Sequence, residues 1–264
     1  MSKKTNGAVL TGSEKTIQIV MHIILVFLSL CCLYPFLVIL GSSFQSQEEI
    51  MSIGYKLSPK EPTLNAYSVL MANSRRLVNA YGITIVTTVV GTLLGLILVS
   101  TCGYVMSRKD YAYRRALSFY VFFTMLFNGG LVPTYLLYTR YLHLSDTIWV
   151  YIIPGLVSAW NIFYIRASFQ ALPEEIIESA VLDGASEWRI LVTFMIPLSK
   201  PVLATIALFT GLAIWNEWYN CMLFISDTKL YTLQYYLYNM LNNAAAMKEL
   251  VSGTSTDLLA STDL

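Results

Sequence analysis

The chain carries five long stretches in which apolar residues predominate and charges are almost absent. A bilayer core about 30 Å thick needs roughly 20 such residues in one helix. Because lipid cannot hydrogen-bond the backbone, each spanning segment must satisfy its own polar groups, as a helix does. We therefore predict an all-α, polytopic membrane protein. Its five expected spans are residues 17–40, 79–106, 116–138, 147–165 and 202–225.

Composition agrees with this prediction and excludes other classes. The 264 residues are 56% hydrophobic and only 12% charged, which is unusual for a soluble domain. The net charge of +1 gives no footprint for nucleic acid. The four cysteines lie in apolar segments without metal-type spacing, so we expect packing roles and no metal site. His22 and His143 stand apart from other ligands, and no Walker A loop is present. We therefore predict no catalytic residues, and any ATP chemistry would belong to another subunit.

Lys and Arg predict the orientation, since cytosolic loops are enriched in both. The short loop Arg108–Arg115 holds four of them, which favours a cytosolic N-terminus. The first span is too long for a signal peptide and contains Pro35, so we interpret it as an uncleaved span. The expected topology places residues 1–16 and the loop 166–201 in the cytosol, and residues 226–264 outside.

The loop 166–201 contains a short helix with clear start and stop signals. Pro173 suits the first helical position, and Glu174 and Glu175 complement the helix dipole. Gly184 is expected to end the helix in a left-handed conformation. Ser186 can then cap a second helix.

A helix of about ten residues is not stable alone in water, so its apolar face needs a partner surface. One alternative is an interfacial helix on lipid, but such helices prefer basic polar faces, whereas this one is acidic. A protein partner is the better interpretation. The residues expected on that face are Ile176, Ile177, Ala180 and Val181.

These residues resemble the EAA loop of ATP-binding-cassette importer permeases. The family pattern is Glu-Ala-Ala, a glycine four residues later and a hydrophobic-X-Leu-Pro ending, and this chain has Ser179 for one alanine, with Phe194 and Ile196 as the other changes. The resemblance implies that the loop is a coupling helix seated in a groove of a cytosolic ATPase. The coupling residues it implies are Glu178, Ser179, Ala180, Asp183, Gly184 and Pro197.

Polar residues inside the expected spans are candidates for a substrate pathway. We favour a cavity-lining role for Asn128, because an amide beside two glycines exposes backbone polarity. A mixed cluster of amide, carboxylate and indole groups suits the hydroxyls and flat faces of sugars. The alternative, equally weighted for the carboxylate, is an aromatic belt with a helix-to-helix hydrogen bond. That cluster is Trp215, Asn216, Glu217 and Trp218.

Gly91 and Gly95 form a small-residue face that would pack either within the chain or against a partner.

Three segments narrow the resemblance to the maltose-type carbohydrate permeases, and within them to the branch that imports complex oligosaccharides, including uronate-containing ones. They are residues 127–135, the cluster 215–218 and residues 231–234. The resemblance implies a type I importer permease fold with six spans, of which five are present here. It further implies a bacterial inner-membrane location, a heterodimer with a second permease, two ATPase subunits that bind ATP and Mg, an extracellular sugar-binding protein and alternating access.

Two other functions remain open from the residues alone. An ion-coupled secondary transporter is disfavoured, because only Glu217 is acidic within the spans and no inverted repeat is visible. A non-transporting scaffold would leave the cytosolic motif and the polar clusters unexplained.

Overall fold

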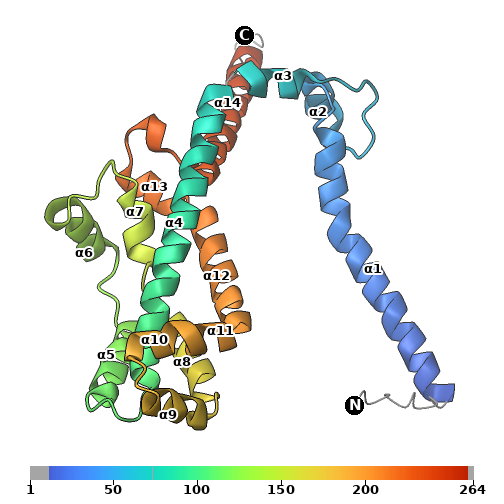
Figure 1. The fold of residues 1–264 in the computed structure, drawn as a ribbon. Helices are drawn as coiled ribbons and strands as arrows, with labels where there is room; N and C mark the ends of the chain where they lie inside the picture. The colour runs from blue at the N-terminus through green and yellow to red at the C-terminus, as the bar shows by residue number, and fades with distance from the viewer. Residues whose placement is uncertain (1–11, 73, 261–264) are drawn as a thin grey trace. The chain divides into compact units, whose positions relative to one another are not determined.

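The computed structural model describes residues 12–72 and 74–260, and within those ranges the chain is helical without β-strands. The chain divides into two compact units, Met1–Ser74 and Arg75–Leu264. The predicted all-α class is therefore confirmed. Figure 1 gives the helix labels used below.

The first unit contains α1 (Gly12–Ser42), α2 (Gln47–Ile53) and α3 (Asn65–Ala72). Ser46 caps α2, since its hydroxyl accepts a hydrogen bond from the Glu49 N–H at 3.2 Å. The link to α3 folds back onto this capped end: the Lys60 N–H donates to Glu49 Oε1 at 3.0 Å. This hydrogen bond lowers the pKa of Glu49 below its usual value.

The second unit is built on α4 (Ser74–Ser107), a helix of 34 residues. Its buried positions recur every three or four residues and are mostly small, so neighbouring helices can approach its backbone closely. A Cβ on Gly91 would lie 2.7 Å from Ile214 Cδ1, and one on Gly103 would lie 2.4 Å from Ile165 Cγ2. The face that contains Gly91 therefore packs within the chain. The small buried residues of this stripe are Ala80, Thr84, Thr87, Gly91, Gly95, Ser100 and Gly103.

The remaining helices of the second unit are short, and several join at sharp bends. They are α5 (Arg114–Leu126), α6 (Leu131–Leu136), η1 (Leu137–Tyr141), α7 (Trp149–Ile152), η2 (Ile153–Gly155), α8 (Ala159–Gln170), α9 (Glu174–Leu182), α10 (Glu187–Ile190), η3 (Leu191–Met195), α11 (Ile196–Leu198), α12 (Lys200–Trp215), α13 (Tyr219–Phe224), η4 (Thr228–Leu230) and α14 (Leu233–Ala260).

Two helices of the described chain are long and apolar enough to cross a bilayer, and the number rises to five if each bent pair counts as one span. The pair α5 and α6–η1 bends by 111°, α7–η2 and α8 by 50°, and α10–α11 and α12 by 83°. The expected range 202–225 is thus divided, since α12 ends at Trp215 and α13 begins at Tyr219.

Most of the C-terminal segment, expected as an extracytoplasmic loop or tail, forms the long helix α14. Its run of Leu, Ala and Met residues has high helix propensity, which a search for spans by hydropathy does not register. Within the described residues, α14 is not among the helices apolar enough to cross a bilayer.

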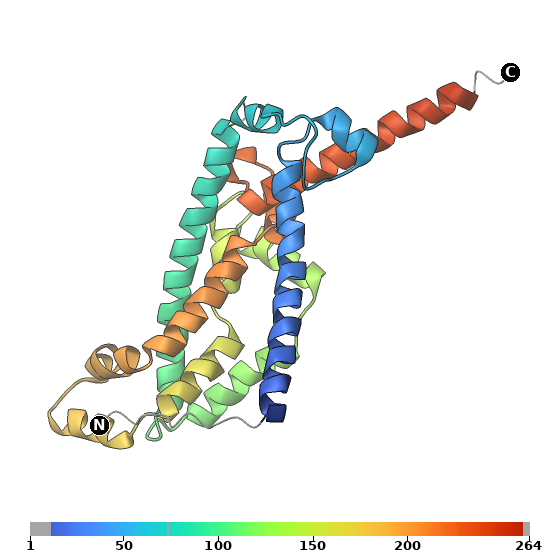
Figure 2. The ribbon, with the colours of Figure 1, turned by 90° about the vertical axis from the view of Figure 1, so that its right-hand side faces the viewer.

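Two clusters of buried side chains lie in the second unit. The first joins α4 and α8 to α9, α10 and η3, with Met106, Ile165 and Ile190 fully buried. The second joins α7 to α13 through Val150 and Cys221. Figures 1 and 2 show α9 and α10 beside the C-terminal end of α4, while α13 and the start of α14 lie toward its N-terminal end.

Candidate functional site

The helix predicted in the loop 166–201 is α9, and its two ends have the expected chemistry. Pro173 is the N-cap, with φ −57° and ψ 131°, so the prediction that it occupies the first helical position is wrong by one residue. Gly184 is left-handed, with φ +75°, as predicted. The Gly184 N–H donates to the Val181 carbonyl and the Ala185 N–H to the Ala180 carbonyl, both at 3.0 Å. This pair of hydrogen bonds is a Schellman motif.

The loop continues through the second predicted helix, α10. Ser186 caps it, accepting from the Arg189 N–H at 3.4 Å, which confirms that prediction. The π-helical turn η3 then leads into α11, whose second residue is Pro197. Proline has no N–H and its ring crowds the carbonyl four residues before it, which accounts for the widened turn preceding Pro197.

The apolar face of α9 is shared between this chain and solvent. Ala180 is 5% exposed, and Ile177 packs beside it against the first buried cluster. The expectation that both need a separate partner is therefore wrong, because α4, α8 and η3 supply that surface. Three large apolar side chains of α9 and α10 stay exposed instead: Val181 at 46%, Leu182 at 88% and Trp188 at 62%. Glu178, Ser179, Asp183 and Pro197 are also exposed.

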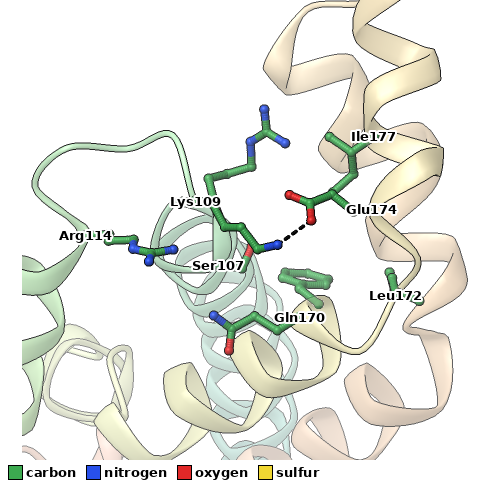
Figure 3. Close-up of a pocket in the computed structure, with 9 residues that line it drawn as sticks. Ser107, Lys109, Arg114, Gln170, Leu172, Glu174 and Ile177 are labelled. Carbon is green, nitrogen blue, oxygen red and sulfur yellow. Dashed lines mark hydrogen bonds and ion pairs between the residues drawn. The ribbon is translucent and has the colours of Figure 1, made fainter.

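Two acidic residues attach the loop to the end of α4. Glu187, at the start of α10, accepts a hydrogen bond from the Tyr104 hydroxyl and lies 3.1 Å from Arg108 Nη2. Glu174, at the start of α9, forms an ion pair with Lys109 (Figure 3). The starts of α9 and α10 are therefore both connected to the last turn of α4 and the two residues that follow it.

The polar turn between α12 and α13 contains the predicted cluster, but as a helix break rather than a helix interior. Asn216 Nδ2 donates to the Leu212 carbonyl at 2.8 Å and closes the end of α12. Glu217 Oε1 accepts from the Asn220 N–H at 2.8 Å and caps the start of α13. The sequence did not indicate this role of Glu217, because glutamate is not among the residues preferred at the start of a helix.

The aromatic members of this turn differ in exposure. Trp215 is half-buried, whereas Trp218 is 38% exposed and packs against Tyr238 of α14 with ring centroids 4.8 Å apart. Asn216 Oδ1 also accepts from Gln234 Nε2 at 3.1 Å, so α14 borders the turn. The turn thus combines an exposed amide with an exposed indole.

Asn128 lies elsewhere, at the 111° bend between α5 and α6. Its Oδ1 accepts from the Gly130 N–H at 2.7 Å, and Gly130 has φ +84°. The side chain therefore stabilises the bend, a local role beside the predicted cavity-lining one. Asn128 itself is exposed.

The loop between η1 and α7 holds a further carboxylate that organises the chain beyond α13. Asp146 Oδ1 accepts from the backbone N–H groups of Ser226 at 2.6 Å and Asp227 at 3.0 Å. These hydrogen bonds lower the pKa of Asp146 below its usual value. Asp146 adopts φ +52°, a conformation that Asp and Asn tolerate better than most residues.

A family model for the inner membrane component of binding-protein-dependent transport systems matches residues 91–248. The chain belongs to this family. The permease is 38% identical over 200 residues to Protein LplC of Bacillus subtilis (strain 168), covering 76% of this chain and 67% of LplC. It is 33% identical over 210 residues to the polygalacturonan/rhamnogalacturonan transport system permease protein YtcP of the same organism, covering 80% and 73%.

A solved structure agrees with these relatives. The permease aligns with a chain from a bacterial ABC transporter involved in the import of the acidic polysaccharide alginate, with TM-score 0.80 and 30% identity over 88% of this chain and 82% of that one. The resemblance to ATP-binding-cassette importer permeases and the type I permease fold are therefore confirmed. The permease is a multi-pass membrane protein and a transport subunit rather than an enzyme.

Proposed function

We propose that this permease moves oligosaccharides inward by alternating access, driven by a separate ATPase that docks on the α9–α10 loop. Relatives named for polygalacturonan, rhamnogalacturonan and alginate support a carbohydrate substrate, including uronate-containing fragments. The partners in this proposal are a second homologous permease, two ATPase subunits and an extracellular sugar-binding protein. The N-terminus and the loop face the cytosol.

The observation that carries the docking proposal is the exposed apolar tip of the loop. Leu182 is 88% exposed and Trp188 62% exposed, although α9 is already anchored from behind by Ala180. A short helix that ends in a Schellman motif and presents large apolar side chains outward has the features of a helix that binds in a groove. Glu178 and Asp183 flank this tip with negative charge, which suits a basic groove rim.

The substrate proposal concerns the turn at residues 215–218. Its exposed indole at Trp218 offers an apolar face to a sugar ring, and Asn216 offers a polar amide to hydroxyl groups. Asn128 remains a proposed pathway residue through its exposed position at the α5–α6 bend.

The docking proposal is tested by two substitutions in the assembled importer. Leu182→Glu should cost the permease almost no stability, because the side chain contacts little of its own chain, but should abolish co-purification of the ATPase and sugar-stimulated ATP hydrolysis. Gly184→Pro should also abolish co-purification of the ATPase and sugar-stimulated ATP hydrolysis. Proline fixes φ near −65° and cannot adopt the observed +75°, so the turn after α9 would be lost.

Gly184→Asn is the matched control, because asparagine tolerates the left-handed region and nothing lies within 4 Å of a Cβ at this position. It should retain most of the ATPase binding. If Leu182→Glu and Gly184→Pro both bind the ATPase as the wild type does, the loop is not the docking element and the proposal is wrong.

A further inference from the structure

A pocket of about 290 Å³ lies behind the α9–α10 loop, where the end of α4 meets α5, α8 and α9 (Figure 3). Its lining includes the polar residues Ser107, Arg114 and Gln170 and the apolar residues Phe169 and Ile177. Figure 3 shows the Arg114 guanidinium and the Gln170 amide on the same side of the pocket as Ser107. The exposed docking tip of the loop is not part of this pocket.

The charges around the pocket are not balanced. Arg108, Lys109 and Arg114 line it, against the single carboxylate of Glu174. Lys109 is paired with Glu174, and Arg108 is paired with Glu187 and Asp110. Among the described residues Arg114 has no carboxylate partner, although it is half-buried. A partly desolvated guanidinium without a counter-charge favours an anion beside it.

The start of α5 adds to the positive charge around the pocket. Arg114 is the first residue of α5, its first turn contains no acidic residue, and the N-cap Tyr113 provides no side-chain hydrogen bond. A helix N-terminus carries partial positive charge, so the half-buried Arg114 in the first turn is unfavourable unless an anion is bound nearby. An anion in the pocket would interact favourably with both the guanidinium and the helix end.

We propose that this pocket binds a phosphate group. The planar guanidinium of Arg114 matches phosphate oxygens in a bidentate arrangement, and the Ser107 hydroxyl and Gln170 amide are further donors. The phosphate comes from the headgroup of an anionic phospholipid of the inner leaflet or from free phosphate, two sources with the same chemistry. The lipid source rests on the proposed function, because it requires this end of α4 to face the cytosol. Basic pockets between membrane helices on that side are suited to anionic headgroups.

The test uses the intact importer complex in two kinds of lipid disc, one of phosphatidylcholine alone and one that also contains phosphatidylglycerol. Native mass spectrometry measures the phosphatidylglycerol retained after the lipid is stripped, and calorimetry in the uncharged discs measures binding of inorganic phosphate. Arg114→Gln is compared with Arg115→Gln, which removes the same charge from the next residue, an exposed position that does not line the pocket. Arg114→Lys keeps the positive charge but removes the planar guanidinium that can bind two phosphate oxygens at once.

We expect Arg114→Gln to weaken the binding at least about tenfold, as the loss of a charge-assisted hydrogen bond should, with a smaller loss in Arg114→Lys and none in Arg115→Gln. Retained phosphatidylglycerol without a phosphate signal identifies the lipid source, and a phosphate signal identifies the free anion. Equal losses in both glutamine variants would mean general surface charge and would overturn the site.

The wild-type complex decides the question even if Arg114→Gln fails to assemble. If it retains no phosphatidylglycerol in preference to phosphatidylcholine and binds no phosphate, the proposal is wrong. Sugar uptake by the same complex reports the proposed function separately, so an importer that transports sugar but binds neither ligand overturns the phosphate site alone.

Discussion

Replacing Glu187 with alanine should separate ATP hydrolysis from transport more than any other change at the base of α4. The carboxylate is the acceptor for the Tyr104 hydroxyl, and Tyr104 is only 5% exposed. Its second partner, Arg108, has a side chain that is 16% exposed. Removing the carboxylate leaves a buried hydroxyl without its acceptor, which costs about 1–3 kcal/mol. Arg108 keeps its ion pair with Asp110 at 3.4 Å, so the loss of its contact with Glu187 adds little to this cost.

The expected total is therefore about 2 kcal/mol, or roughly thirtyfold in the equilibrium between an attached and a detached α10. Glu174→Ala is the matched control, because it also removes a carboxylate that ties the loop to α4. The Glu174 and Lys109 side chains are 50% and 67% exposed, and such a surface pair contributes about 0–1 kcal/mol. Loss of the Glu174–Lys109 pair should therefore change the coupling of ATP hydrolysis to transport far less than loss of Glu187.

The assay is the ratio of oligosaccharide imported to ATP hydrolysed by the complex in proteoliposomes. Glu187→Ala should lower this ratio several-fold while ATPase binding persists, and Glu174→Ala should remain near the wild type. A double-mutant cycle with Tyr104→Phe should show non-additivity of about 1 kcal/mol in thermal unfolding. Equal ratios for the two carboxylate variants, or strictly additive effects with Tyr104→Phe, would refute the reasoning.

Two further predictions concern the opposite end of the second unit. Trp218→Ala should reduce uptake of labelled oligosaccharide several-fold without loss of the ATPase from the complex, while Trp160→Ala, another exposed indole, should not; equal uptake in both would favour a belt role for Trp218. The pKa of Asp146 is lowered, so its stabilising effect is present at neutral pH and is lost as the pH falls below its usual value of 3.8. The gap in melting temperature between wild type and Asp146→Asn should therefore shrink in acid, and a pH-independent gap would contradict this.

The ends of α9 and the start of α10 were predictable because their signals are local. Gly184 needs a left-handed backbone, and Ser186 supplies a cap to an N–H three residues away, so neither depends on distant parts of the chain. The one-residue error at Pro173 has the same origin, since proline is acceptable both at the N-cap and at the position after it.

What faces α9 could not be predicted from its periodicity. The pattern places Ile177, Ala180 and Val181 on one side of the helix, but it does not say which of them meets this chain and which meets another. The answer depends on α4, α8 and η3, and the loop is held against α4 by contacts such as that of Tyr104 with Glu187, 83 residues apart in sequence. No local signal indicates such a pair.

The break at residues 216–218 escaped prediction for a different reason. Hydropathy is high both before and after residues 216–218, so the sequence predicts one span over 202–225. The interruption comes from side chains that replace the helical hydrogen bonds: Asn216 closes α12 and Glu217 opens α13. The polar residues that marked a substrate cluster also end the helix, which is why they are exposed at a turn.

The packing of α4 connects the two ends of this unit. Near its C-terminus Gly103 contacts α8 and Tyr104 holds the loop, whereas Gly91 contacts Ile214 of α12 next to the polar turn. Thr84 Oγ1, further toward the N-terminus, accepts from the Leu233 N–H at the start of α14 at 2.9 Å. A helix of 34 residues is about 51 Å long, and its small, closely packed face leaves little room for α8 or α12 to slide independently. If an ATPase displaces the loop as proposed, α4 is therefore the rigid element that would carry the displacement to the turn at Trp218.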